Sequence, residues 1–170
     1  MSKIAVFGSA FNPPSLGHKS VIESLAHFDQ VLLVPSISHA WGKEMLDYTI
    51  RCQLVDLFIE ELSTKNVVRS DVEEQLFVPN QPVTTFSVLE TLQKQFPESE
   101  LTFVIGPDNL LKFGQFARSD EILEKWNVLA CPEKVKIRST DIRSKLAHAS
   151  SIEGLTTQKV AILLKELSVY

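Results

Sequence analysis

A turn built from glycine, hydroxyl and proline residues follows the first apolar run of the sequence. It reads GSAFNPPSLGH, residues 8–18. Pro13 and Pro14 fix φ and disfavour a helix directly before them, so the chain must run extended and then enter a helix near Gly17. The free N–H groups at such a helix start favour anions, and Ser15 and His18 add a hydroxyl and a further donor. A phosphate site is one interpretation, and an N-capping Ser15 with a solvated His18 is the other.

A second set of residue types suited to anions lies in a basic segment near the C-terminal end of the sequence. Between residues 134 and 145 a single acid, Asp141, stands against five basic residues: Lys134, Lys136, Arg138, Arg143 and Lys145. Ser139 and Thr140 open a helical pattern that either hydroxyl could cap. The local charge of +4 and these hydroxyls favour a polyphosphate site. A solvated loop before an ordinary capped helix is the alternative.

Gly106 and Asp108 follow a buried apolar run, Leu101–Ile105. A carboxylate just beyond a strand end can accept hydrogen bonds from a ribose diol, and Gly106 permits close approach of a ring or a backbone. Asp108 as the cap of a short helix over 109–112 explains the same position.

Short apolar runs alternate with helical stripes along the chain. The runs are Ile4–Phe7, Val31–Val34, Val67–Val68, Leu101–Ile105 and Val128–Ala130, and the stripes lie within 21–26, 50–62 and 86–96. Such runs are typical of strands covered on both faces. We therefore expect an α/β fold, a Rossmann-like doubly wound parallel sheet of about five strands, with ligands beyond the carboxyl ends of the strands. We expect one domain, 1–170, whose part from about residue 139 onward is helical.

The turn and the basic segment resemble motifs of known enzymes. GSAFNPPSLGH resembles the signature G-[GST]-[TSA]-F-[DN]-P-x-[HT]-x-G-H of the nucleotidylyltransferase superfamily, with Ser15 where these enzymes carry His or Thr. Residues 138–143, RSTDIR, are similar to the I-S-S-T-x-I-R motif of nicotinate or nicotinamide mononucleotide adenylyltransferases. The resemblance implies that these residues bind ATP: Gly8, Ser9, Ala10, Phe11, Gly17, His18, Arg138, Ser139, Thr140 and Arg143.

Less complete matches in the middle of the chain are similar to further segments of the same family. The family's G-x-D contacts the adenosine of ATP, which implies that role for Gly106 and Asp108. The family also has a loop with a Lys, an Arg in the following helix, a Thr at the start of the third helix and a Trp that stacks on the pyridine ring. These match Lys43, Arg51, Thr85 and Phe116, respectively. The resemblance therefore implies that these four residues, with Ser9 and Ala10, bind a pyridine mononucleotide. Phe116 stands where the family has that Trp. A solvated Arg51 and a capping Thr84 or Thr85 are the alternatives.

The reaction implied by the resemblance is transfer of AMP from ATP to nicotinate or nicotinamide mononucleotide, with release of pyrophosphate, in NAD biosynthesis. His18, Lys43 and Ser15 are the expected catalytic residues. Mg²⁺ is expected to arrive with ATP, and no protein metal site is expected. One alternative is a related transferase with another phosphorylated acceptor, such as phosphopantetheine or a phospho-alcohol with CTP. Another is a nucleotide-binding regulatory protein that has lost turnover.

Composition limits the remaining classes of function. The chain has 170 residues, 44% of them hydrophobic, and its net charge of −4 argues against a general binder of nucleic acid or anionic membranes. No apolar run approaches the ~18 residues of a membrane-spanning helix. Cys52 and Cys131 match no metal spacing, which favours a reducing cytoplasm. The Glu60–Glu61 and Glu73–Glu74 doublets do not lie at a predicted strand end and are interpreted as solvated charge. The oligomeric state is left open, and a homo-oligomer is one possibility.

Overall fold

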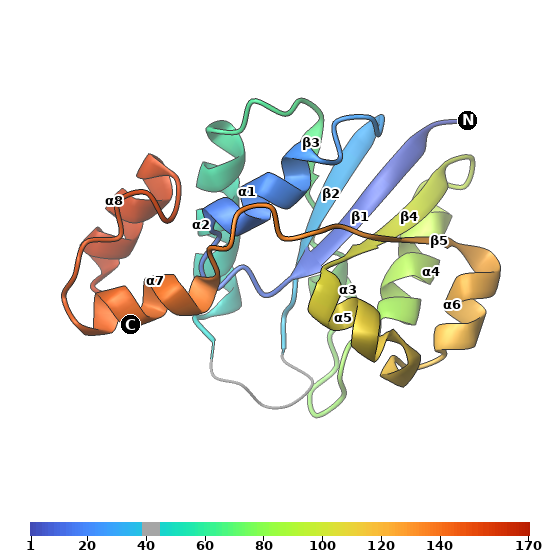
Figure 1. Cartoon of the computed structure of the whole chain (residues 1–170). Helices are drawn as coiled ribbons and strands as arrows, with labels where there is room; N and C mark the ends of the chain where they lie inside the picture. The colour runs from blue at the N-terminus through green and yellow to red at the C-terminus, as the bar shows by residue number, and fades with distance from the viewer. Residues whose placement is uncertain (39–44) are drawn as a thin grey trace.

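Five parallel strands form the centre of the structure, a computed structural model that describes residues 1–38 and 45–170 (Figure 1). The strands are β1 (Lys3–Ser9), β2 (Gln30–Pro35), β3 (Val67–Arg69), β4 (Glu100–Ile105) and β5 (Asn127–Ala130). Their order is β3-β2-β1-β4-β5, and every neighbouring pair is parallel. Each predicted apolar run lies within one strand, so the predicted doubly wound α/β sheet is confirmed.

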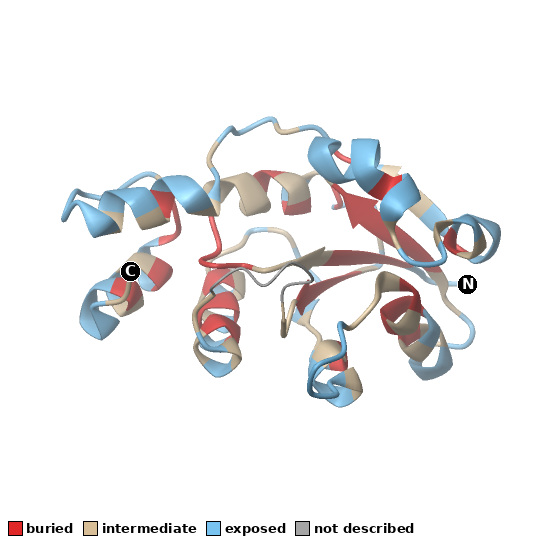
Figure 2. Ribbon diagram, turned by 90° about the horizontal axis from the view of Figure 1, so that it is seen from below, coloured by how far each residue is buried: buried red, intermediate tan, exposed pale blue. Residues whose placement is uncertain are grey.

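Helices cover both faces of this sheet (Figure 2). They are α1 (Leu16–Glu23), α2 (Tyr48–Glu60), α3 (Val72–Leu76), α4 (Thr85–Gln95), α5 (Pro107–Lys112), α6 (Ser119–Lys125), α7 (Ser139–Ala147) and α8 (Gln158–Leu167), with a 3₁₀ turn at Phe113–Gln115. Side chains of β1 alternate between two buried clusters. Ala5 and Phe7 pack with α1, α2, α7 and α8, whereas Ile4 and Val6 pack with α3, α4 and α6. Both faces of the strand are therefore apolar, as its uninterrupted run predicts.

The strand order reverses between β1 and β4. From β1 the chain proceeds outward through β2 to β3, and it then returns to β4 on the other side of β1. The loops that follow two strands at such a switch point diverge and leave a crevice beyond the carboxyl edge. Here these loops are the turn between β1 and α1, which we call the first turn (Ala10–Ser15), and the connection through Gly106 into α5.

The predicted C-terminal helical part consists of α7 and α8 (Figure 1). α8 lies beside α2, where the backbone N–H and the ammonium of Lys159 donate to Glu61 Oε2 (2.8 Å) and Glu60 Oε2 (3.0 Å). Val160 and Leu164 of α8 are buried in the same cluster as Phe7. Among the described helices, none is both long and apolar enough to cross a membrane.

Candidate active site

Ser15 ends the first turn and caps α1. Its Oγ accepts a hydrogen bond from the backbone N–H of His18 (3.3 Å) and donates to the carbonyl of Ile137 (3.2 Å). The side chain is buried, and these bonds fix the start of the helix. The capping interpretation of Ser15 is therefore confirmed, and in the described structure its hydroxyl positions His18.

His18 is half-buried in α1, just after the first turn, so the interpretation as a solvated residue is wrong. Its Nδ1 accepts from the backbone N–H of Ser15 (3.0 Å), and its Nε2 lies 3.0 Å from Ser9 Oγ. Burial lowers the pKa of His18 from 6.5 to about 4, because the imidazolium form loses hydration. A neutral ring whose Nδ1 accepts must carry its proton on Nε2, so His18 presents a neutral donor beside Ser9.

Phe11 is fully buried and packs its ring against the ring of His18, with 4.8 Å between the centroids, and against that of Phe7 at 5.7 Å. The apolar ring therefore belongs to the core, and binding of ATP at Phe11 stays a prediction. Its place in the signature follows from its support of the imidazole.

Gly17 allows the segment before α7 to lie directly against the start of α1. A Cβ at this position would lie 2.0 Å from the carbonyl oxygen of Ile137, which is far inside van der Waals contact. Only glycine fits here without a backbone shift. The two predicted anion-binding segments therefore touch at this residue, although more than a hundred residues separate them in the chain.

Three side chains from the C-terminal helical part bind the backbone of the first turn. The carbonyls of Asn12–Pro14 accept, in chain order, from Arg143 Nη1 (2.7 Å), Ser139 Oγ (2.6 Å) and Thr156 Oγ1 (2.8 Å). We call this set of three bonds the carbonyl clamp. The prediction that Ser139 or Thr140 caps α7 is wrong, since the N-cap residue is Arg138 and its N–H donates to Asp141 Oδ2 (2.9 Å). Ser139 binds the first turn instead.

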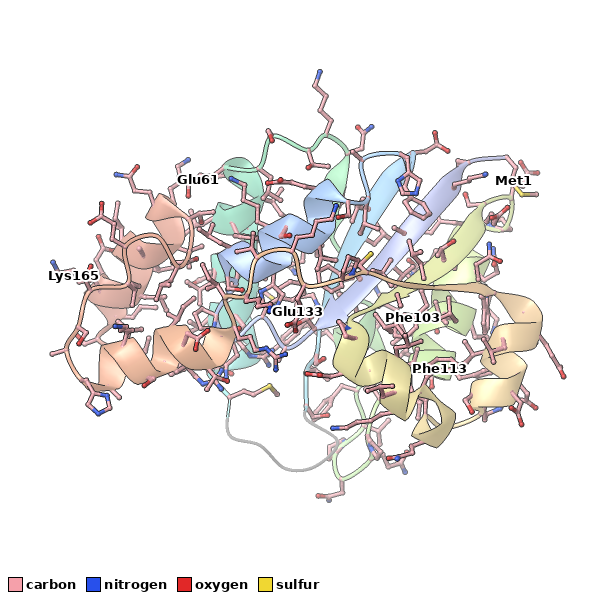
Figure 3. All side chains as sticks on the ribbon, viewed as in Figure 1. Met1, Glu61, Phe103, Phe113, Glu133 and Lys165 are labelled. Carbon is pink, nitrogen blue, oxygen red and sulfur yellow. The ribbon has the colours of Figure 1, made fainter. Side chains whose placement is uncertain are left out.

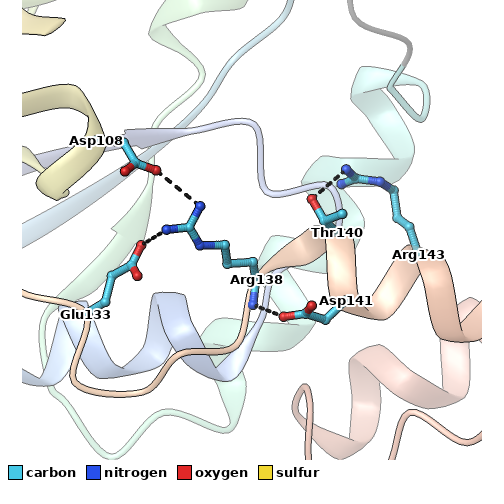
Figure 4. Close-up of polar contacts among 6 residues, drawn as sticks. All are labelled: Asp108, Glu133, Arg138, Thr140, Asp141 and Arg143. Atoms are coloured by element: carbon cyan, nitrogen blue, oxygen red, sulfur yellow. Dashed lines mark hydrogen bonds and ion pairs between the residues drawn. The ribbon is translucent and has the colours of Figure 1, made fainter.

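Arg138 and Arg143 serve different parts of the site (Figure 4). Arg138 pairs with Asp108 Oδ2 (3.1 Å) and Glu133 Oε1 (2.7 Å), and these carboxylates raise the pKa of its guanidinium. Arg143 donates through Nη2 to Thr140 Oγ1 (3.1 Å) in addition to its bond in the carbonyl clamp. The capping interpretation of Asp108 is wrong, because Gly106 is the N-cap residue of α5 and Asp108 lies exposed in its first turn.

Two cavities open at the carboxyl edge of the sheet. The first cavity, about 240 Å³, is lined by Ser15, predicted to be catalytic, and by many of the residues predicted to bind ATP: Gly8, Ser9, Gly17, His18, Gly106, Asp108, Arg138 and Ser139. The second cavity, about 290 Å³, is lined by most of those predicted to bind the mononucleotide: Ser9, Ala10, Thr85 and Phe116. Both cavities share Gly8, Ser9 and Asn109. Two ligands that fill them would therefore meet at the end of β1.

Some predicted site residues line neither cavity. They are Phe11, Arg51, Thr140 and Arg143. Direct ligand contacts of Thr140 and Arg143 stay predictions. Lys43, predicted to be catalytic, lies outside the described residues.

Arg51 is buried, so its interpretation as part of a solvated helix face is wrong. Its Nε donates to the carbonyl of Leu46 (2.7 Å), and its Nη1 donates to the carbonyls of Ala10 (2.8 Å) and Ser36 (2.6 Å). Burial lowers the pKa of its guanidinium from the usual value. Arg51 thus holds the backbone of Ala10, which lines the second cavity, and contact of its own side chain with the mononucleotide stays a prediction.

Aromatic rings and a threonine form much of the wall of the second cavity. The centroid of the Phe116 ring lies 5.2 Å from that of Phe113 and 6.2 Å from that of Phe103. Figure 3 labels these two neighbouring rings, Phe103 and Phe113. Thr84 Oγ1 caps α4 by accepting from Ser87 N (3.2 Å), which resolves the capping alternative in favour of Thr84. Thr85 is therefore released from that role and lines the cavity.

Glu73 is a site residue that the sequence analysis assigned wrongly to solvated charge. It is half-buried, lines the second cavity, and accepts a hydrogen bond at Oε1 from Ile37 N (3.1 Å). Burial raises the pKa of Glu73 from 4.5 to about 7. The sequence signal that could have identified Glu73 is its short separation from the predicted strand Val67–Val68. Because β3 ends at Arg69 and α3 begins at Val72, Glu73 lies just beyond the carboxyl edge of the sheet. Asn109, which lines both cavities, was also missed.

Comparison with known proteins agrees with the motifs. The sequence profile of the cytidylyltransferase-like family matches residues 6–150. A Desulfotalea psychrophila protein described as a probable nicotinate-nucleotide adenylyltransferase is 28% identical over 147 residues, 84% of this chain and 69% of that protein. A protein of Anaeromyxobacter sp. with the same description is 26% identical over 184 residues, 99% of this chain and 96% of that protein.

Solved structures show the same fold. A putative nicotinate-nucleotide adenylyltransferase from Vibrio parahaemolyticus has a TM-score of 0.88 and 57% identity, and the match covers 97% of this chain and 99% of that chain. Plasmodium falciparum nicotinic acid mononucleotide adenylyltransferase, solved with NaAD, has a TM-score of 0.81 at 14% identity over 100% and 98% of the two chains, a likeness in fold alone. Because the family profile spans most of the sequence and the relatives are described as nucleotide adenylyltransferases, the chain belongs to the cytidylyltransferase-like family and is a nucleotidyltransferase.

Proposed function

We propose that this protein transfers AMP from ATP to nicotinate, or nicotinamide, mononucleotide and releases pyrophosphate. The observation that carries the proposal is the pair of cavities that meet at Gly8 and Ser9. One cavity has the donors that a triphosphate needs, and the other has an aromatic and apolar wall suited to a pyridine ring. A reaction that joins two nucleotides through their phosphates needs such a junction.

The acceptor phosphate is the nucleophile in this proposal. Its second pKa is near ~6, so it is anionic at neutral pH and needs no general base. An acceptor oxygen attacks the α-phosphorus, the bond from that phosphorus to the bridging oxygen of the β-phosphate breaks, and pyrophosphate leaves with the electron pair. The task of the protein is alignment and stabilisation of the charge that develops.

His18 and the start of α1 supply donors at the junction. The neutral Nε2–H of His18 lies next to Ser9, on the wall that both cavities share. A neutral donor in a half-buried site can stabilise a pentavalent phosphoryl group more strongly as negative charge develops on its oxygens.

Arg138 and Asp108 line the first cavity and form an ion pair with each other. Their ion pair is exposed, and such pairs contribute about 0–1 kcal/mol, so a polyphosphate can compete for the guanidinium. Asp108 is then available to accept hydrogen bonds from the ribose diol of ATP. This exchange of partners gives both residues the ATP-binding roles that the resemblance implies.

Mg²⁺ is proposed to arrive on the phosphates of ATP, where it neutralises part of their charge. Within the described ranges no group of three or more His, Cys, Asp or Glu side chains could hold a metal ion. The carboxylates on the first cavity, Asp108 and Glu133, both bind Arg138. This donor set fits an ion held by phosphate oxygens and water. A cytoplasmic location is part of the proposal, supported by the free, buried thiols of Cys52 and Cys131.

The proposal is tested by pyrophosphate release from Mg-ATP with a panel of acceptors. We expect rapid release with a pyridine mononucleotide and none with phosphopantetheine or without an acceptor. Turnover only with phosphopantetheine, or only with CTP and a phospho-alcohol, would assign the chain to a related transferase. ATP binding without release on any acceptor would assign it to a regulatory role.

A further inference from the structure

The side chain of Asn12 is buried in the first turn, and its amide oxygen accepts two hydrogen bonds. One donor is the backbone N–H of Leu46 (3.2 Å), in the segment before α2, and the other is the hydroxyl of Tyr170, which follows α8. The Leu46 N–H can only donate, so the atom that it meets is the amide oxygen, and Tyr170 must donate to the same oxygen. Two donors saturate the two lone pairs of a carbonyl oxygen. The orientation of this amide is therefore fixed by two segments distant in the chain.

Arg51 connects the same groups to the wall of the second cavity. Its Nε donates to the carbonyl of Leu46 (2.7 Å), and its Nη1 donates to the carbonyls of Ala10 (2.8 Å) and Ser36 (2.6 Å). Leu46 is thus held at its N–H by Asn12 and at its carbonyl by Arg51. We call these bonds, together with the two bonds to Asn12 Oδ1, the Asn12 network.

The Asn12 network and the carbonyl clamp hold the first turn against different parts of the site. Ala10 and Ser36, whose carbonyls the network binds, line the second cavity and not the first. Ser139 of the carbonyl clamp lines the first cavity and not the second. A bond lost from the network should therefore disturb the acceptor site more than the ATP site.

Tyr170 joins the C-terminal helical part to this network. Its side chain packs against the apolar cluster that contains Phe7 and Leu164, and it lines neither the first nor the second cavity. Burial raises the pKa of the Tyr170 hydroxyl above its usual value, although the charges of Arg143 and Arg51 oppose this rise. The hydroxyl therefore keeps its proton and donates to Asn12 at neutral pH.

We propose that Tyr170 is a positioning residue for the acceptor, whose hydroxyl fixes the amide of Asn12 and, through the Asn12 network, the backbone that lines the second cavity. The inference rests on the proposed function and adds to it a residue that acts without lining either cavity. Without the hydroxyl, the amide oxygen keeps one of its two donors, and the buried amide loses its fixed orientation. Leu46 then loses part of its restraint, and with it the contact that places Arg51.

The test replaces Tyr170 by phenylalanine, which keeps the packed ring and removes the hydroxyl. KM and kcat are measured for the pyridine mononucleotide at saturating Mg-ATP, and for ATP at saturating mononucleotide. We expect Y170F to raise KM for the mononucleotide about three- to tenfold, the effect of about one hydrogen bond, and KM for ATP by less than about twofold. A merely structural role would lower the folded fraction, and thereby kcat per chain, and would leave both KM values unchanged.

Tyr48→Phe is the matched control, because Tyr48 is the other tyrosine of the chain and its buried hydroxyl bonds to no group of the Asn12 network. We expect both KM values of Y48F to equal those of the wild type. A wild-type KM for the mononucleotide in Y170F, or an equal rise of KM for both substrates, would overturn the inference and leave the proposed function intact. Absence of turnover with either mononucleotide in the wild-type enzyme would overturn both.

Hydrogen exchange of the Leu46 amide, followed by NMR in the wild type and in Y170F, is a readout that does not depend on turnover. We expect this amide to exchange about five- to tenfold faster in Y170F, because its acceptor is no longer fixed. The amide of Leu16, which donates to the carbonyl of Leu155 (2.9 Å), is the internal control and should exchange at the wild-type rate. Equal exchange of Leu46 in the two proteins, or equal acceleration at Leu16 and Leu46, would contradict the proposed role of Tyr170.

Discussion

His18 shows how its surroundings determine the chemical form of a side chain. The Ser15 N–H occupies Nδ1, Phe11 covers the ring, and burial keeps the imidazole neutral. The proton is thereby held on Nε2, beside the point where the two cavities meet. Arg51 is a comparable case, since burial holds its guanidinium against the backbone, where it binds the carbonyl of Ala10.

His18→Ala should lower kcat by roughly 10²- to 10³-fold, because it removes one preorganised donor from the transferring phosphoryl group. The effect on KM for ATP should be smaller, since the other donors of the first cavity stay in place. Steady-state pyrophosphate release measures both constants. His27→Ala, an exposed position, is the control and should behave as the wild type. Full turnover by H18A would contradict the role in the transition state.

The lowered pKa of His18 also predicts a pH dependence of stability. The pKa of His18 is 6.5 in the unfolded chain and about 4 in the folded chain. Between these two pH values the unfolded state therefore binds more protons than the folded state. The stabilisation is fully present above pH 6.5 and is lost as the pH falls towards 4. His18→Gln should reduce this loss. Denaturant unfolding of the wild type and of H18Q at pH 7 and 4.5 measures this loss of stability. An equal loss in the two proteins would contradict the lowered pKa of His18.

At the scale of the elements, the crevice depends on close contact between α1 and the segment that leads into α7. Gly17 permits that contact, with Ile137 O where a Cβ would otherwise lie. The segment before α7 contains Glu133 and Arg138, which line the first cavity. The shape of this cavity therefore depends on the distance between that segment and α1.

Gly17→Ala should lower the free energy of unfolding by about 1–3 kcal/mol or more, because either α1 or the Ile137 backbone must shift. In a chain of this size that corresponds to a fall in Tm of roughly 3–10 °C. Gly114→Ala is a suitable control, since nothing lies within 4 Å of its Cβ. Thermal unfolding of both variants checks the prediction, and a G17A protein as stable as G114A would refute the steric argument.

The sequence predicts the elements and the motif residues better than it predicts the roles of those residues. Continuous apolar runs mark buried parallel strands, so the sheet could be inferred. Ser139, Arg143 and Arg51 match motif positions, yet their partners are backbone carbonyls distant in the chain, which no residue spacing encodes. Glu73 was missed because β3 is only three residues long and gives a weak strand signal.

At the scale of the whole molecule, the C-terminal helical part completes the first turn. The carbonyl clamp joins α7 and the segment before α8 to Asn12–Pro14, and Tyr170 Oη binds Asn12 Oδ1 as well. The turn that follows β1 is therefore held by the sheet on one side and by these helices on the other.

Thr156→Val should lower stability by about 1–3 kcal/mol, because it leaves the buried carbonyl of Pro14 without its donor. It should also lower kcat/KM for ATP, since the first turn loses one of the three bonds of the carbonyl clamp. Thr157→Val is a matched control, because the buried Thr157 hydroxyl has no hydrogen-bond partner among the described residues. Equal stability and kinetics in the two variants would show that this bond of the clamp is dispensable.

The carbonyl clamp has a consequence for the order in which the enzyme matures. Its bonds join positions 126 to 142 residues apart, so the first of them needs residue 139 and the complete clamp cannot form until residue 156 has left the ribosome. At about 5–20 residues per second, synthesis of the intervening chain takes roughly 7 to 30 seconds. Strands β1 to β4 can pair during this interval while the first turn still lacks its donors. A nascent chain would thus acquire its sheet before it acquires a competent phosphate site.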